Sequence, residues 1–228
     1  MPAKSRNFVP NQVFVGLPWK NVRARYERVL ARLELRFPLH FTIVGKNDGQ
    51  SAEDLFEVIK SRISQSSVGI FDATGGNPNV SLEYGYAEGL EIDRVIYVST
   101  HKAAPVHAGA PIISDLGGKR RIQYKTEKSL MSHLESFART HAYTLRYEKF
   151  VTKAFARLGK GNKKSSRTLA LKVVHALDGV ENRRHDDLVQ RVQANGYKDS
   201  DIREMIRKLH TAGLIRAEVG RYSRVRVA

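Results

Sequence analysis

The stretch Val68-Gly69-Ile70-Phe71-Asp72-Ala73-Thr74-Gly75-Gly76-Asn77-Pro78 decides the fold expected for this chain. It begins with a short apolar run that is typical of a buried strand. It ends with Asn77 and Pro78, which suit the N-cap and the first position of a helix. Gly75 and Gly76 let the backbone turn tightly between these two parts. The stretch therefore predicts a strand, a turn and a helix that continues to about residue 90.

Further apolar runs alternate with helical patterns on both sides of this stretch. Strands are expected at 13–17, 41–44, 95–98 and 121–124, and helices at 21–37, 51–63 and 127–139. Parallel strands covered on both faces read as continuous Val, Ile and Phe runs, as these do. The pattern predicts an α/β domain over residues 1–143, with a flavodoxin-like five-stranded parallel sheet in the order 2-1-3-4-5.

In a sheet of this order, ligands bind outside the carboxyl ends of strands 1 and 3, where the strand order reverses. We expect the substrate-binding residues at these ends and at the start of the helix from Pro78. They are Gly16, Leu17, Pro18, Trp19, Gly75, Gly76, Asn77, Asn79 and Tyr86. Trp19 either stacks on a base at the mouth of the pocket or packs as a lid or core aromatic.

Two carboxylates are expected near this end of the sheet. Asp72 lies at the tip of its strand, and Glu83 lies in the second turn of the following helix. A pair of carboxylates flanking a glycosidic carbon is a standard arrangement for glycosyl transfer. Asp72 and Glu83 are therefore candidate catalytic residues. The alternative is that Asp72 only caps a turn and that Glu83 pairs with an arginine of the first helix.

Positive charge is concentrated in the C-terminal part of the chain. Residues 144–228 hold 20 Lys or Arg against 9 Asp or Glu, whereas the whole chain of 228 residues has a net charge of +16. Such a segment favours a phosphate-rich partner, most simply nucleic acid. The alternative is that the basic surface serves only solubility.

The C-terminal part also has its own pattern. Residues 144–165 are expected to form a helix followed by a basic Gly/Lys/Ser linker. In residues 166–228, helical patterns at 169–177, 186–194 and 199–212 precede two alternating strands at 214–219 and 222–227. Three helices and a terminal hairpin are typical of a winged helix-turn-helix.

The candidate nucleic-acid-binding residues are Lys198, Arg203, Arg207, Arg221, Arg224 and Arg226. Asp199 and Asp201 complicate this interpretation, because they stand at the helix end that normally enters the major groove and would repel phosphates. A module for dimerisation or for docking a partner protein is the alternative.

Several classes of protein and of site are disfavoured. No apolar run approaches the ~18 residues of a membrane span, and the N-terminus lacks the apolar core of a secretory signal. The absence of cysteine excludes disulfides and thiolate zinc sites, and no metal is assigned to the scattered histidines. Without a G-x-G-x-x-G motif after a strand, a dinucleotide held as a redox cofactor is not expected. We expect a cytoplasmic protein that forms a homo-oligomer.

Three segments resemble one superfamily: residues 13–18, residues 71–87, and residues 111–116 through Tyr124. The middle segment, D-x-T-x-x-N-P-N-V-x-x-E-x-G-x-A, is the most specific. Together they resemble the nucleoside 2-deoxyribosyltransferase-like group and its relatives, the bacterial TIR-like predicted nucleotide-binding proteins. The resemblance covers about residues 12–137.

This resemblance implies cleavage or transfer at an N-glycosidic bond. It implies that Glu83 is the catalytic glutamate, that Asp72 contacts the sugar or base, and that Gly16 lines the nucleotide pocket. Deoxyribosyltransferases proper usually have a Gly-Thr pair where this chain has Asn79 and Val80. The Asn-Pro-Asn sequence is more similar to the TIR-like branch, whose members often cleave NAD and serve in defence against phage. NAD hydrolysis is thus the expected function; the alternatives are a deoxyribosyltransferase and a nucleotide-sensing DNA-binding regulator without turnover.

Overall fold

A computed structural model describes residues 8–19, 22–45, 52–100, 121–178, 183–218 and 221–224. Its larger sheet consists of five parallel strands in the order β2-β1-β3-β4-β5, as the sequence predicted. These strands are β1 (Val9–Gly16), β2 (His40–Thr42), β3 (Ser66–Asp72), β4 (Asp93–Ser99) and β5 (Arg121–Tyr124).

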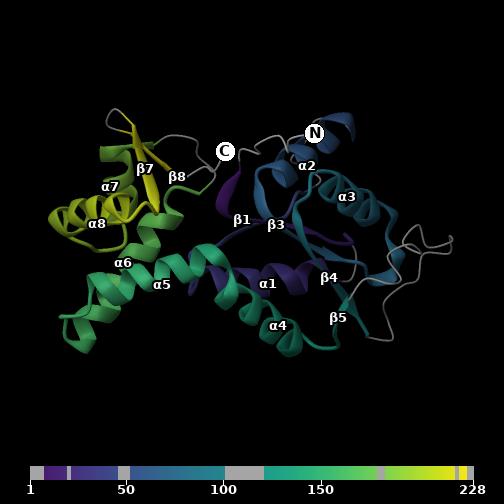
Figure 1. Cartoon of the computed structure of the whole chain (residues 1–228), viewed down its shortest axis with the longest axis horizontal. Coiled ribbons are helices and arrows are strands. Elements are labelled where there is room, and N and C mark those ends of the chain that lie inside the picture. The colour runs from purple at the N-terminus through teal and green to yellow at the C-terminus, as the bar shows by residue number, and fades with distance from the viewer. Residues whose placement is uncertain are drawn as a thin grey trace.

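Helices cover both faces of this sheet (Figure 1). One face carries α1 (Arg23–Glu34) and α4 (Glu127–Thr140), and the other carries α2 (Ala52–Ser64) and α3 (Pro78–Gly89). Neighbouring side chains of a strand point to opposite faces. Accordingly, Ile70 of β3 packs in the core that includes α1 and α4, whereas Phe71 packs in the core that includes α2 and α3.

The C-terminal unit contains three further helices and a second, antiparallel sheet in the order β6-β8-β7. After α5 (Ala142–Ala154) come α6 (Lys160–His175), β6 (Arg183–Arg184), α7 (His185–Gln193), α8 (Asp199–Thr211), β7 (Ile215–Glu218) and β8 (Arg221–Arg224). The α7 and α8 helices and the hairpin lie close to their predicted positions, whereas α6 begins nine residues before the predicted start at 169. The short strand β6 was not predicted.

The basic linker expected before residue 166 is not a linker, because α6 begins at Lys160 and continues to His175. Its later turns bury Leu169, Ala170 and Val173. A helix nucleated by such packing extends through polar residues at little cost, which explains why the Gly/Lys/Ser composition misled the prediction.

The two units are packed together through one hydrophobic cluster that includes residues of α1, α4, α5, α6, α7 and α8. Polar contacts cross the junction as well: His175 Nε2 donates to the Phe37 carbonyl at 3.0 Å, and Tyr147 Oη donates to the Arg167 carbonyl at 2.9 Å. The C-terminal unit is therefore held against the α/β domain by buried contacts.

The first strand begins four residues earlier than its apolar run at 13–17 indicated, because Asn11 and Gln12 are buried within it. The Asn11 amide nitrogen donates to the Pro38 carbonyl at 3.2 Å and the Gln12 amide nitrogen donates to the Ser66 hydroxyl at 3.3 Å, whereas the two amide oxygens have no partner among the described residues. The segment at 111–116, on which part of the resemblance rests, lies outside the described residues. Among the described helices, none combines the length and the hydrophobicity that crossing a membrane requires.

Candidate active site

A cavity of about 270 Å³ opens at the carboxyl end of β1, between that strand, α2 and α3. This is the switch point at which the sequence predicted a ligand site. Most of its lining is apolar, and Glu83 is the one acidic side chain among its described lining residues. They are Phe14, Val15, Gly16, Leu17, Trp19, Ile43, Val44, Leu55, Phe56, Ile59, Asn77, Asn79, Leu82 and Glu83.

The turn before α3 positions Glu83. Gly75 and Gly76 form this turn with positive φ angles of 73° and 66°, a region that favours glycine. The Asn77 side chain then caps the helix by accepting from the backbone N–H of Asn79 at 2.9 Å and of Val80 at 3.4 Å. With Pro78 as the first helical residue, Glu83 falls in the second turn, one turn after Asn79, and both residues line the cavity.

Glu83 is half-buried, and one oxygen of its carboxyl group is enclosed by the protein. Its Oε2 atom has no hydrogen-bond partner among the described residues. That oxygen lies directly against Gly16, where a Cβ atom would collide with it. Burial raises the pKa of Glu83 to about 8, because a charged carboxylate loses its hydration there. With this pKa the group is mostly protonated at neutral pH, and a neighbouring cation would favour its ionised form.

Asp72 lies on the other face of the sheet. Phe71 packs toward α2 and α3, so the next residue of β3 faces α1 and α4. The Asp72 carboxylate is fully buried there, where Oδ1 accepts from the Thr74 backbone N–H at 2.9 Å and Oδ2 accepts from the Tyr124 hydroxyl at 2.6 Å. The structure therefore does not bring Asp72 and Glu83 together in one cavity.

The hydrogen bonds of Asp72 hold the turn that precedes α3. Burial raises the pKa of Asp72, while the bonds from Thr74 and Tyr124 act in the opposite direction. Thr74 belongs to the short 3-10 turn η1 (Thr74–Gly76), and its hydroxyl oxygen accepts from the Ser99 backbone N–H at 2.7 Å. Asp72 thus connects the tip of β3 to β5 and, through Thr74, to the end of β4.

Trp19 lines the cavity, and an arginine fixes its position. The Arg23 guanidinium carbon lies 4.5 Å from the centre of the Trp19 ring, a distance typical of cation–π contact. Arg23 also donates to the Val44 carbonyl at 3.3 Å and pairs with Glu27 at 2.7 Å. The Arg23 guanidinium, whose charge is paired with Glu27, therefore packs on the ring of Trp19 beside the cavity.

The other expected substrate-binding residues divide into two groups. Gly16, Leu17, Asn77 and Asn79 line the cavity with Trp19. In contrast, Pro18, Gly75, Gly76 and Tyr86 are not among its lining residues; Pro18 is buried and Tyr86 packs against the core beneath α3.

Sequence reasoning missed the contribution of α2. Leu55, Phe56 and Ile59 line the cavity, whereas the sequence predicted only that residues 51–63 form a helix. No group of three or more His, Asp or Glu side chains suited to a metal ion occurs within the described ranges.

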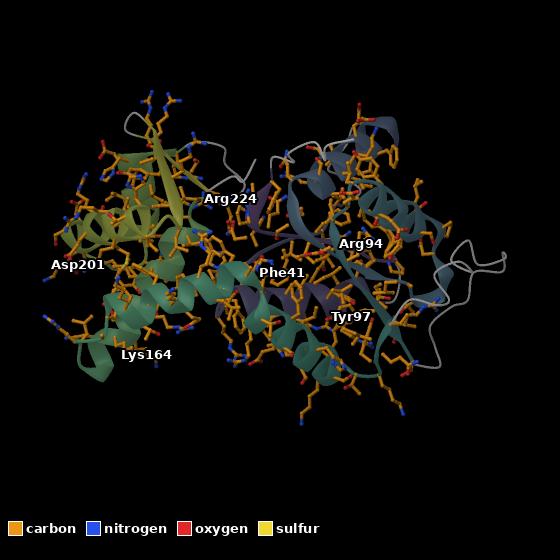
Figure 2. The ribbon with its side chains drawn as sticks, in the orientation of Figure 1. Phe41, Arg94, Tyr97, Lys164, Asp201 and Arg224 are labelled. Atoms are coloured by element: carbon orange, nitrogen blue, oxygen red, sulfur yellow. The ribbon has the colours of Figure 1, made fainter. Side chains whose placement is uncertain are left out.

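The candidate nucleic-acid-binding residues do not form one free basic surface. Arg203 pairs with Asp199 at 2.6 Å and with Asp186 at 3.3 Å. The Arg224 side chain is only 11% exposed and lies 3.7 Å from Asp178, and Figure 2 shows it on the side of the C-terminal unit that faces the α/β domain. Exposed cations remain at Lys198, Arg207 and Arg221, whereas Arg226 lies outside the described residues.

The sequence matches no protein-family model and no curated protein. Among solved structures, a CMP N-glycosidase of Clostridium botulinum is 17% identical, with 54% of this chain and 98% of that chain covered at a TM-score of 0.39. A 2-desoxiribosyltransferase from Leishmania mexicana is also 17% identical, with 55% of this chain and 98% of that chain covered at a TM-score of 0.42.

Proposed function

We propose that this protein cleaves an N-glycosidic bond of a nucleotide in the cavity between β1 and α3, with Glu83 as the reacting carboxyl group. The observation that carries the proposal is the buried Oε2 atom of Glu83, which has no partner among the described residues, beside a cavity of about 270 Å³ at the switch point of the sheet. The motif from Asp72 to Ala87, which resembles that of N-glycosidic enzymes, supports the same chemistry.

The reaction requires the bond between the sugar C1′ and the base nitrogen to break, with its electron pair leaving on the base. Positive charge then develops on the sugar ring, as in other glycosyl transfers. An ionised Glu83 stabilises that charge or attacks C1′, and water completes the hydrolysis. Because the carboxylate is poorly hydrated, its attraction for the developing cation is strong.

We further propose NAD as the substrate. A neutral base departs easily only if an acid protonates it, and Asp72, the expected second carboxylate, lies on the opposite face of the sheet. The nicotinamide ring of NAD is already a cation and leaves as a neutral base without a proton. A single carboxylate therefore suffices for NAD, and the cationic ring itself promotes ionisation of Glu83.

The cavity constrains how NAD lies. About 270 Å³ is at or below the low end of the roughly 300–1,000 Å³ of drug-sized ligand sites. We expect the nicotinamide riboside half to lie inside, near Glu83 and Trp19, and the adenosine half to lie outside the mouth. Asp72 acts as a positioning residue in this scheme, because it holds the turn from which α3 starts.

The test is incubation of the purified full chain with NAD and with a panel of ribonucleosides and deoxyribonucleosides, with the released base measured by chromatography. Glu83→Gln keeps the shape of the side chain and removes its charge, so base release should fall at least about 100-fold. The matched control is Glu88→Gln, the same change on the same helix at a residue paired with Arg94 on the surface. Equal activity of the two variants would refute the role of Glu83.

The pH dependence of kcat/KM separates the two uses of Glu83, since it reports the free enzyme. If the ionised group reacts, as proposed for NAD, activity rises with pH up to about 8, the raised pKa of Glu83. If the protonated group donates to a neutral base, activity falls above that pH. The second result would favour a nucleoside hydrolase or a deoxyribosyltransferase.

We also propose that the C-terminal unit is a winged helix. Support comes from its order of elements, in which β6 follows α6, the hairpin of β7 and β8 follows α8, and the strands pair as β6-β8-β7. This order accounts for a third strand that the sequence did not reveal.

A further inference from the structure

A groove of about 620 Å³ runs between the second half of α5 and the last turns of α8. Four of its lining residues are cationic and none is acidic; the remainder are small or aromatic. They are Lys149, Phe150, Lys153, Ala154, Arg207, Lys208, Thr211 and Ala212. The groove belongs to neither the candidate active site nor the first turn of α8 with its two aspartates.

Two of the four cations of this groove, Lys149 and Lys153, are exposed and have no ion pair among the described residues. Lys208 pairs with Glu204 at 2.6 Å. Arg207 is exposed and makes no ion pair in the described part of the chain, but the same Glu204 carboxylate lies within its electrostatic reach. Because Lys149 and Lys153 are four residues apart on one helix, they present their charges on the same side of the groove.

A second cationic hollow shows what a compensated site looks like. It lies where the end of α1 meets α4, α5 and α6; its three arginines are Arg36, Arg139 and Arg167, and Lys164 is its fourth cation. There Arg36 pairs with Glu135 at 2.8 Å, Arg139 pairs with the same carboxylate, and Arg167 pairs with Glu148. Those charges stabilise the protein itself, whereas the charges of the α5–α8 groove are left to attract an external anion.

The two walls of the groove are fixed to one another. The Tyr143 hydroxyl on α5 donates to the Leu214 carbonyl at 2.8 Å, and the Arg146 guanidinium donates to the Gly213 carbonyl at 3.0 Å. Both acceptors lie in the turn that follows α8. These two hydrogen bonds hold the walls of the groove together within the protein itself. The helix α5 also joins the C-terminal unit to the α/β domain (Figure 1).

An aromatic ring lies between the cations. Phe150 lines the groove and is partly buried, and its ring meets Phe155 edge-on with 5.7 Å between the ring centres. A positively charged groove with an aromatic stacking surface is the usual means of holding single-stranded nucleic acid, because cations follow the phosphates while bases stack on rings. A duplex keeps its bases stacked inside and cannot use such a ring.

We propose that the groove between α5 and α8 binds single-stranded nucleic acid, with Lys149, Lys153 and Arg207 contacting phosphates and Phe150 stacking on a base. This inference does not depend on the N-glycosidic activity proposed for Glu83. Of the residues that the sequence suggested for nucleic-acid binding it keeps Arg207, and it moves the other contacts from the hairpin and the start of α8 to α5.

The experiment measures binding of the full chain to a labelled 20-nucleotide single strand, to the matching duplex and to inorganic polyphosphate of comparable charge. Lys149→Glu/Lys153→Glu should weaken binding of the single strand at least about tenfold at low salt and reduce the slope of log K against log salt by about 1.4. The control is Lys198→Glu/Arg221→Glu, which changes the net charge equally on the surface first suspected. It should weaken binding less than twofold.

Phe150→Leu tests the stacking contact apart from the charge. It should weaken binding of the single strand about fivefold or more and leave polyphosphate binding unchanged, because polyphosphate has no bases. Phe150→Tyr, which keeps a ring, should restore binding. Thermal unfolding of each variant shows whether the packing against Phe155 survives.

Three results would overturn the proposal. The first is a control variant that loses as much affinity as the groove variant. The second is a duplex that binds more tightly than the single strand, which would indicate a winged-helix contact. The third is an unchanged single-strand affinity in Phe150→Leu with a normal unfolding temperature, which would reduce the groove to a general anion site. Base release from NAD, measured on the same variants, should remain at the wild-type level in each case.

Discussion

Glu83 and Asp72 lie near the same edge of the parallel sheet, on opposite faces, and their surroundings differ. On the α2 and α3 side, Glu83 borders an open cavity and its Oε2 atom has no partner among the described residues. On the α1 and α4 side, Asp72 is enclosed and accepts from Thr74 and Tyr124. Burial raises the pKa of both carboxyl groups. The difference lies in the surroundings: the Asp72 oxygens accept hydrogen bonds, whereas Glu83 Oε2 has no partner among the described residues and its side chain lines a cavity.

The surroundings of Glu83 should have their largest effect on how the free energy of unfolding changes with pH. The pKa of Glu83 is about 8 in the folded protein and near 4.5 in the unfolded chain, so the folded state binds the extra proton between these values. The contribution is complete below about pH 4.5 and is lost as pH rises through 8, by at most about 1.4 kcal/mol per pH unit. Denaturant unfolding from pH 5 to 9 should show this decline in the wild type and a flatter curve in Glu83→Gln.

The quantity to compare is the difference between the two curves. His141 acts in the opposite sense at lower pH, because burial lowers its pKa to about 4 and the unfolded state then binds more protons up to about pH 6.5. That contribution is common to both proteins and cancels. A difference that stays constant with pH would mean that Glu83 is not in the buried state described here.

Asp72 should matter next, and through stability. Asp72→Ala leaves the Thr74 N–H and the Tyr124 hydroxyl buried without their acceptor, which should lower the free energy of unfolding by about 2–4 kcal/mol. Asp72→Asn keeps an acceptor for Thr74 and offers an amide to Tyr124, so it should stay within about 1 kcal/mol of the wild type. If Asp72→Asn instead abolishes base release without a change in stability, Asp72 belongs to the chemistry and the contrast with Glu83 fails.

Gly16 should show a smaller effect that is tied to Glu83. The Cβ atom of Gly16→Ala would collide with Glu83 Oε2 and lie 2.9 Å from a ring carbon of Phe71. Overpacking of this kind costs about 1–3 kcal/mol and should displace the reacting carboxyl group, lowering base release at least about tenfold. Combining Gly16→Ala with Glu83→Ala should recover part of the lost stability, which a double-mutant cycle measures.

The control for this change lies on α3. A Cβ atom at Gly85 meets nothing within 4 Å, so Gly85→Ala should leave stability unchanged or slightly raised. Equal losses in Gly16→Ala and Gly85→Ala would show that the close approach of Glu83 to β1 is not what constrains position 16.

Much of the fold could be predicted from the sequence because apolar runs mark the centres of β1, β3 and β4, whereas β5 includes the polar residues Arg121 and Gln123. The strand order followed from topology, which also predicted a ligand site at the edge where the structure has its cavity. The sequence did not reveal that Asp72 and Glu83 lie on opposite faces of the sheet. The two residues are close along the chain, but successive residues of a strand face opposite sides, so this closeness does not decide which face each takes. The assignment of Phe71 to the α2 and α3 core would have revealed this, yet nothing in the sequence says which face Phe71 takes.

The C-terminal unit was less predictable for a different reason. Its helices follow their hydrophobic periodicity, but the state of each cation depends on residues brought together by folding. Arg203 is neutralised by Asp186, which is 17 positions earlier, and Arg224 is buried beside Asp178, whereas Lys149 and Lys153 stay free. Composition identified this half as basic without identifying which surface carries the charge.

The smallest predicted effect concerns Asn77, which connects the two parts of the comparison. Asn77 follows the turn held by Asp72, caps α3 and lines the cavity beside Glu83. Asn77→Ala removes the cap and should lower stability by about 1 kcal/mol, whereas Asn77→Ser supplies another capping oxygen and should restore it.

If Asn77 only caps the helix, Ser restores base release together with stability. If it also contacts the substrate, Ser restores stability while KM stays raised, because the shorter side chain no longer reaches into the cavity. Unfolding and kinetics measured on both variants decide between these roles, and full activity in Asn77→Ala would exclude any part for this residue in substrate binding.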